Sequence, residues 1–226
     1  MKSITQYRKA TVSAAEKIMK GEGMTLVSKM DELLSSKFPA SQQEIQNDSV
    51  IVYQQIMMDA VAQVQVLERY IGLHVPQMED GNNFGVTVQM TICKFLKDTR
   101  EEWMKHLEKI PTFYSAKADA MDKCDTEKSS AAETKTQTES NIVGGKDGDE
   151  IKTITVSVKE NKTTCDDADK AMRKDHLQAI NIQCFISVKT ALTDSMTSYL
   201  SILDNMEKNI SKLTSPKGSG TSMGMY

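Results

Sequence analysis

The chain has 226 residues, and its 28 basic and 31 acidic side chains give a formal net charge of −3. This length can bury a sizeable core in one large domain or two small ones. Aromatic residues form only 5% of the sequence, and 11 glycines and 4 prolines are too few for a β-sandwich or barrel with many tight turns. Because the acidic balance provides no overall basic field, we expect no nucleic-acid partner.

The sequence carries no recognisable targeting or metal-binding signal. No stretch reaches the roughly 18 consecutive apolar residues of a membrane span, and the N-terminal segment lacks the apolar region of a secretory signal. Its cysteines form no C-x-x-C pair, and no histidine lies near them at zinc-ligand spacing. We therefore expect reduced thiols, no metal or other cofactor, no membrane partner, and a cytoplasmic or nuclear location.

The first half of the chain predicts two long helices. The first covers about residues 3–36, and Gly21 and Gly23 can bend it. The second covers about residues 41–74 and ends before Pro76, which lacks an N–H and disfavours helical geometry in the preceding residue. Apolar residues recur weakly in the first helix, at Ile4, Ile18, Val27, Met30 and Leu34. The second has alternating three- and four-residue steps, at Val50, Tyr53, Met57, Ala60, Val64, Leu67 and Ile71.

The second half predicts two more helices, over about residues 86–122 and 166–213. Pro111 interrupts the third, where we expect a kink and not a stop because the apolar spacing resumes after it. The third helix presents an apolar stripe at Ile92, Leu96, Trp103, Leu107, Ile110 and Tyr114. The fourth has one at Val188, Leu192, Tyr199, Leu203, Met206, Ile210 and Leu213.

Residues 123–164, between the third and fourth helices, differ in composition from the rest. They are rich in Thr, Ser, Lys, Glu and Asp and have few large apolar side chains, which is typical of a disordered insertion. Within them, Ile151 to Val158 alternates as a strand does. A short exposed hairpin and strand pairing between subunits are the two structures that this alternation allows.

Four long amphipathic helices with few aromatic residues predict an all-α protein, a long antiparallel four-helix bundle in a single domain over residues 1–226. In such a bundle the connection between helices two and three lies at the same end as the C-terminus. The loop 76–86 and the tail 215–226 should therefore share one end, and the insertion 123–164 should lie at the other.

No catalytic motif is present in the sequence. It contains neither G-x-S-x-G, nor G-x-x-x-x-G-K-[ST], nor H-E-x-x-H, so we expect that the chain is not an enzyme. Two segments nevertheless carry unusual chemistry. The loop collects Asp, Gly and Asn, which bond their own main chain and hold a fixed turn. The tail, SPKGSGTSMGMY, ends a flexible arm with Met, Tyr and a carboxylate, which suits capture in a pocket.

These two segments carry a resemblance to a known family. The stretch VPQMEDGNNFGVTVQ, residues 75–89, resembles the activation loop of the 11S (REG) proteasome activators, whose signature is close to PRIEDGNNFGVAVQ. The terminal GMY is similar to the family's terminal MIY. The order of helices and the Phe38-Pro39 element after the first helix also agree, so the resemblance covers most of the chain.

The resemblance implies a heptameric ring, homomeric in the simplest case, that caps the 20S proteasome and opens its gate without ATP. It implies that the tails dock between proteasome α subunits, and that Asn82 is the loop residue important for gate opening. The activation-loop residues it implies are Pro76, Glu79, Asp80, Gly81, Asn82, Asn83, Phe84 and Gly85. The docking residues it implies are Gly224, Met225 and Tyr226.

The sequence also departs from the family pattern. Gln77 occupies the position of an arginine in vertebrate members, so any ion pair made there is lost. The connection after Phe38-Pro39 is short and the insertion 123–164 is long, which indicates a divergent member of protozoan type. From the residues alone, a coiled-coil scaffold or adaptor that binds partner helices remains the alternative, because it explains the stripe from Val50 to Ile71 equally well.

Overall fold

The computed structural model describes residues 3–39, 45–77, 84–125, 129–131, 160–162 and 167–216. Their contacts divide the chain into two compact units. Unit 1 comprises Met1–Lys117 and Gln178–Tyr226, and unit 2 comprises Ala118–Leu177. Among the described helices, α4 (Phe84–Asp125) and α5 (Asp167–Lys208) are the ones that extend into unit 2.

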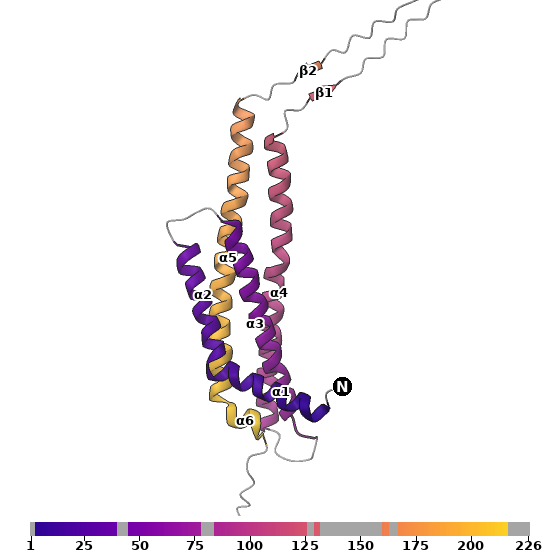
Figure 1. Cartoon of the computed structure of the whole chain (residues 1–226), viewed down its shortest axis with the longest axis vertical. Coiled ribbons are helices and arrows are strands. Elements are labelled where there is room, and N and C mark those ends of the chain that lie inside the picture. The colour runs from indigo at the N-terminus through magenta and orange to yellow at the C-terminus, as the bar shows by residue number, and fades with distance from the viewer. Residues whose placement is uncertain are drawn as a thin grey trace, which may run out of the picture. The chain divides into compact units, whose positions relative to one another are not determined.

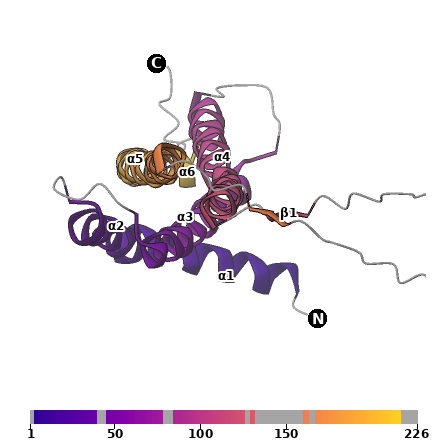
Figure 2. The same cartoon turned by 90° about the horizontal axis from the view of Figure 1, so that it is seen from above.

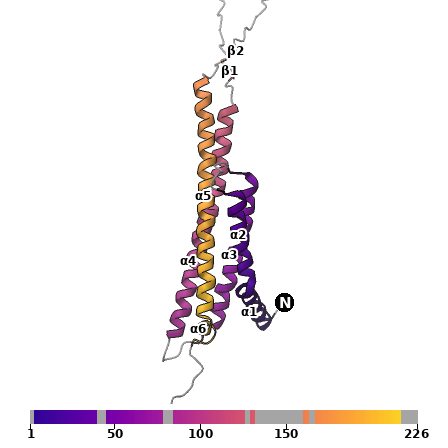
Figure 3. The same cartoon turned by 90° about the vertical axis from the view of Figure 1, so that its left-hand side faces the viewer.

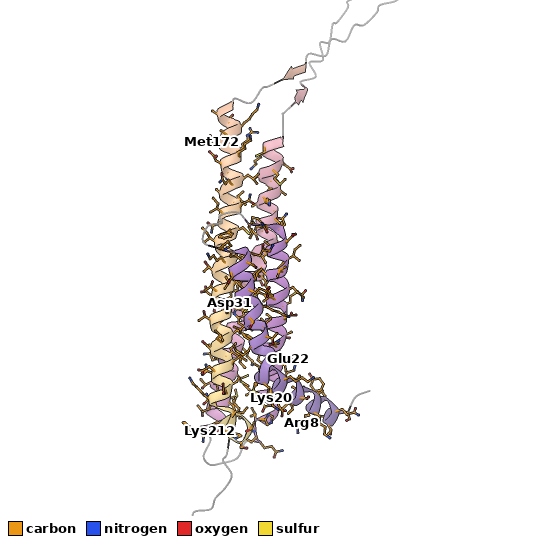
Figure 4. The ribbon with its side chains drawn as sticks, turned by 60° about the vertical axis from the view of Figure 1, so that its left-hand side comes forward. Arg8, Lys20, Glu22, Asp31, Met172 and Lys212 are labelled. Atoms are coloured by element: carbon orange, nitrogen blue, oxygen red, sulfur yellow. The ribbon has the colours of Figure 1, made fainter. Side chains whose placement is uncertain are left out.

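The predicted first helix is in fact two helices joined by a bend. Helix α1 (Ile4–Lys17) starts with a capping box, in which the Ser3 hydroxyl accepts from the Gln6 N–H and the Gln6 side chain accepts from the Ser3 N–H. The π-helical turn η1 (Ile18–Glu22) follows, and the backbone leaves helical geometry at Gly21. Helix α2 (Gly23–Lys37) then runs in a different direction, as Figure 1 shows, and Figure 4 places Lys20 and Glu22 at this bend.

Unit 1 is built from two pairs of helices. Helix α2 packs against α3 (Asn47–His74), and α4 lies beside α5 (Figure 2). Every predicted apolar position from Val50 to Ile71 on α3 is buried, which confirms the amphipathic pattern of that helix. Helix α3 begins at Asn47 instead of about residue 41, because Gln46 before it is extended, with ψ of 134°.

Helix α3 is also long and apolar enough to span a membrane, with a mean hydropathy of 1.2 over an 18-residue window. This differs from the sequence expectation that no such stretch exists. Nine of the ten buried residues of the helix, from Val50 to Ile71, belong to the hydrophobic core. The core helix of a soluble protein passes the same test of length and composition, and 39% of the apolar window of α3 is buried.

The other stripes are confirmed over most of their length and wrong at their ends. Helix α4 continues through Pro111, as expected. Tyr114 after it is exposed, and so is Ile4 of α1, whose exposed fraction is 82%. The predicted fourth helix is broken, because α5 ends at Lys208 and a short helix α6 (Ile210–Thr214) follows a turn at Asn209. This break leaves Ile210 exposed and Leu213 buried.

Aromatic and polar contacts join the two pairs of helices. The Phe38 ring lies 5.3 Å from that of Phe185, so the Phe38-Pro39 element is anchored on α5. The Tyr199 hydroxyl of α5 donates to Gln63 Oε1 of α3. Between α3 and α4, Arg100 Nε donates to Glu68 Oε1 at 2.8 Å. These contacts fix α3, α4 and α5 in register along unit 1.

Unit 2 contains the C-terminal turns of α4, the N-terminal turns of α5 and a small strand pair. Strand β1 (Ser129–Ala131) pairs antiparallel with β2 (Glu160–Lys162), with Ser130 opposite Asn161. The strand predicted over Ile151 to Val158 lies outside the described residues. The Arg173 guanidinium donates to the Lys123 carbonyl at 2.6 Å, which ties α5 to the last turn of α4.

Candidate functional site

The structure describes three of the predicted site residues, which are Pro76, Phe84 and Gly85. The other loop positions, Glu79 to Asn83, and the docking residues Gly224 to Tyr226 lie outside the described residues. The structure therefore shows the points from which the loop and the tail leave the bundle. The end of α3 and the start of α4 flank the loop, and the end of α6 precedes the tail.

The flanks of the loop and the tail meet at one side chain of α4. Gln89 is completely buried, and its Nε2 donates to the His74 carbonyl at 3.0 Å and to the Leu213 carbonyl at 2.7 Å. Both acceptors belong to the last turns of helices, where backbone carbonyls lack a partner within the helix. One amide group therefore satisfies the ends of α3 and α6 and joins both to the first turns of α4.

A second contact joins the loop to the tail directly. Gly85, at the start of α4, is buried, and a Cβ atom placed on it would lie 2.0 Å from the carbonyl oxygen of Pro216. Because real Cβ atoms essentially never approach a backbone atom so closely, only glycine fits this position without a shift of the chain. We call the set formed by His74, Gly85, Gln89, Leu213 and Pro216 the loop–tail junction.

Helix α6 brings the tail to this junction. At Asn209 the backbone leaves helical geometry, with φ of −109° and ψ of 11°, and the Asn209 carbonyl accepts from the Lys212 and Leu213 N–H groups. The chain thereby turns, and Leu213 is completely buried. Figures 1 and 3 show α6 beside the first turns of α4. The break in the predicted fourth helix is thus what places the base of the tail.

The end of α3 is held from two sides. His74 Nδ1 lies 2.8 Å from the Tyr70 carbonyl, and the two rings are 4.5 Å apart. Burial raises the pKa of the Tyr70 hydroxyl, and the negative charge of Glu16 on α1 raises it further. Helix α1, which follows a different direction from α2, contacts α3 and brings the charge of Glu16 close to Tyr70.

Two residues near the loop are accessible. Phe84 exposes 65% of its surface, whereas the next residue, Gly85, is buried. Gln77, which replaces the arginine of vertebrate members, is exposed as well. A missing ion pair at Gln77 would therefore have involved a surface position, where such pairs contribute little to stability.

Sequence reasoning missed Gln89 and Pro216 as site residues. Gln89 stands on the apolar stripe of α4, three residues before Ile92 and seven before Leu96, and both of these are buried. A polar residue at a core position of an amphipathic helix is the signal that could have identified it. Pro216 had no such signal, since its role depends on the turn at Asn209.

Unit 2 holds an open hollow of about 380 Å³. Its lining mixes one carboxylate with basic and apolar groups, namely Ala120, Lys123, Asp169, Met172, Arg173 and His176. Among the described residues no group of three or more His, Cys, Asp or Glu side chains could hold a metal. The loop–tail junction is therefore the site whose geometry agrees with the sequence motifs.

Comparison with known proteins finds a family match over nearly half of the chain. Residues 38–141 match the family described as proteasome activator PA28, C-terminal. This range includes the predicted activation loop, α3, α4 and the start of the insertion. The match thus rests partly on the residues that carried the resemblance.

Solved structures show the same fold over almost the whole chain. The 11S subunit PA28 of the Plasmodium falciparum proteasome is similar with a TM-score of 0.64 and 14% identity, over 94% of this chain and 92% of that one. A chain of the complex between an archaeal 20S proteasome and PA26 follows, with a TM-score of 0.55, 14% identity and coverage of 96% and 93%. The archaeal 20S proteasome with a mutated activator gives 0.53, 13%, and 96% and 92%. The chain therefore matches the family described as proteasome activator PA28, C-terminal, over residues 38–141, and it shares the fold of these 11S and PA26 structures over almost its whole length.

Proposed function

We propose that the chain forms a heptameric ring of identical subunits that docks on the α-subunit face of the 20S proteasome and opens its gate without ATP. A member of this family is a regulatory activator and not itself an enzyme. The observation that carries the proposal is the pair of hydrogen bonds from Gln89, because they bring the bases of loop and tail together. A capping ring needs both elements on the face that meets the proteasome.

In this proposal the tail supplies affinity. A single arm ending in Gly224, Met225 and Tyr226 offers a small contact area and one carboxylate, so it should bind weakly alone. Tails presented together on a rigid ring bind at high effective concentration, and avidity can exceed the affinity of one tail by about 10²- to 10⁴-fold. Docking should therefore depend strongly on the last residues of the chain.

The loop biases the gate. Opening is a shift between closed and open arrangements of the pore, and a ligand shifts such an equilibrium only through different contacts with the two states. A loop centred on Asp80, Gly81 and Asn82 would favour the open state by contacting it alone. Asn82 should therefore affect stimulation far more than binding.

The test separates these two contributions. Purified chain is titrated into purified 20S proteasome without ATP, while hydrolysis of a small fluorogenic peptide and formation of the complex are both followed. Deletion of Tyr226 should abolish complex formation. Asn82→Tyr should leave the complex intact and abolish stimulation, whereas the same change at Asn141 in the insertion is the matched control and should do neither.

Two outcomes would contradict the proposal. If Tyr226 deletion and Asn82→Tyr impair binding equally, the division of work between tail and loop is wrong. If the unmodified chain neither binds nor stimulates the proteasome, the coiled-coil scaffold becomes the better explanation of the fold. Native mass spectrometry tests the ring separately, because seven copies are expected.

A further inference from the structure

We propose that Gln89 and Gly85 are positioning residues that couple the tail to the activation loop, so that docking of the tail sets the position of the loop. This inference rests on the proposed function and adds to it a mechanical connection. The loop and the tail would otherwise be two independent elements that merely emerge at the same end of the bundle.

Gln89 joins the flanks of the loop and the tail through one side-chain group. Its Nε2 group contacts the last turn before the loop, at His74, and the last turn before the tail, at Leu213. Gln89 itself lies only a few residues after the loop, on the first turns of α4. All three chain segments that border the loop and the tail therefore share one donor group.

The amide of Gln89 carries an energetic cost. Gln89 Oε1 is buried and has no hydrogen-bond partner within the described part of the chain. An unpaired buried acceptor destabilises a fold by about 1–3 kcal/mol, so an apolar residue would suit this core position better if packing were the only requirement. The amide is therefore explained better by what its N–H groups hold in place than by stability.

Gly85, at the start of α4, and Pro216, at the base of the tail, are in close contact. The backbone of Pro216 lies against Gly85 so closely that a methyl group has no room between them. Displacement of Pro216 toward α4 by a docked tail must consequently move the start of α4 or be resisted by it. Gly72 on α3 offers the contrast, because a Cβ atom placed there has no neighbour within 4 Å.

The experiment compares two junction variants with two matched controls in the same titration of 20S proteasome. Gln89→Met keeps the length of the side chain and removes both donors, and Gly85→Ala separates Pro216 from α4. Gln55→Met and Gly72→Ala make the same chemical changes on α3, at an exposed glutamine and an uncrowded glycine. Native mass spectrometry and circular dichroism establish that each variant folds and assembles.

The expected result is a split between two measured quantities. Both junction variants should keep the half-saturating concentration of activator within about twofold, since the tails remain intact. Both should lower the maximal stimulation by roughly threefold or more, which for Gln89→Met is the population shift expected from the loss of one net hydrogen bond. The control variants should change neither quantity.

Other results would overturn the inference. If the junction variants bind with unchanged maximal stimulation, or raise only the half-saturating concentration, the junction supports the tail and does not position the loop. Should Gln89→Met fail to assemble, Gly85→Ala decides alone, because it removes no hydrogen bond. Failure of the unmodified chain to stimulate the proteasome would refute the proposed function instead, and the two failures are thereby distinguished.

Discussion

Trp103 Nε1 of α4 donates a hydrogen bond to Ser198 Oγ of α5 at 3.1 Å. The indole exposes only 2% of its surface, and its ring lies 6.0 Å from that of Tyr199. The single tryptophan of the chain thus joins two helices that are far apart in sequence. Its N–H group is a donor that must be satisfied once it is buried.

Ser198→Ala should therefore lower the free energy of unfolding by about 1–2 kcal/mol, because the buried indole N–H loses its acceptor. Ser201→Ala is the matched control, since Ser201 Oγ donates only to the Thr197 carbonyl on the exposed side of the same helix. Urea unfolding followed by tryptophan fluorescence at fixed protein concentration measures both. Equal stability of the two variants would show that the Trp103 bond contributes nothing net.

Tyr53→Phe should stabilise the protein by about 1 kcal/mol at neutral pH. The Tyr53 hydroxyl is buried and has no hydrogen-bond partner among the residues that the structure describes, so its removal relieves a desolvation penalty. Tyr7→Phe, on an exposed part of α1, should leave stability unchanged. A loss of stability in Tyr53→Phe would mean that the hydroxyl has a partner.

The same residue makes stability depend on alkaline pH. Burial raises the pKa of Tyr53 to about 12, above the ordinary value of 10.0, so the folded state disfavours ionisation of this hydroxyl. The unfolding free energy therefore keeps its full value with respect to this group below pH 10, and it falls as the pH rises from there to about 12. Burial also raises the pKa of Tyr199, with a smaller effect from Glu22. Tyr53→Phe should consequently reduce, without abolishing, the fall in unfolding free energy above pH 10.

The buried positions were predictable where the apolar stripe of a helix packs against neighbouring helices along its whole length. Every position that the spacing from Val50 to Ile71 predicted on α3 is buried, because a central helix is covered on that side along its whole length; Ile56 and Tyr70 are buried as well and were not predicted. The pattern was wrong at Ile4 and Tyr114, which are exposed. Periodicity reports which side of a helix is apolar, and it does not report where the neighbouring helices end.

The candidate site was predictable as a location but not as a set of contacts. The parity of an antiparallel bundle placed the loop and the tail at one end, and the Gln89 bonds and the Gly85 contact agree with it. The contacts depend on the turn at Asn209 that creates α6. Nothing in the apolar spacing around Ile210 indicated that turn, since a continuous helix satisfies the same pattern.

Substitution of Gly23 tests the packing at the bend between α1 and α2. A Cβ atom on Gly23 would lie 2.8 Å from Leu203 Cδ2 and 2.9 Å from the Ile18 carbonyl oxygen. The leucine can change rotamer, whereas the backbone carbonyl cannot move without distorting η1. Gly23→Ala should therefore destabilise the protein by about 1–3 kcal/mol.

Gly72→Ala is its counterpart within a helix. The site has free space, and alanine has the higher helix propensity, so this change should stabilise the protein by about 0.5–1 kcal/mol. Thermal unfolding of both variants at one protein concentration provides the comparison. Effects of the same sign would show that propensity, and not the contact with Ile18 and Leu203, governs the bend.

Rings of mixed composition test whether the tails act together. If the chain forms the proposed ring, co-expression of the full chain with a copy that lacks Tyr226 should yield rings with different numbers of intact tails, which native mass spectrometry can count. If binding depends on avidity, each lost tail multiplies the dissociation constant, so affinity for the 20S proteasome should fall steeply and not in proportion to the fraction of intact tails. Co-expression with the Asn141→Tyr copy is the control and should leave affinity unchanged. A linear decline would show that each tail binds independently, and the rigid ring would then have no part in docking.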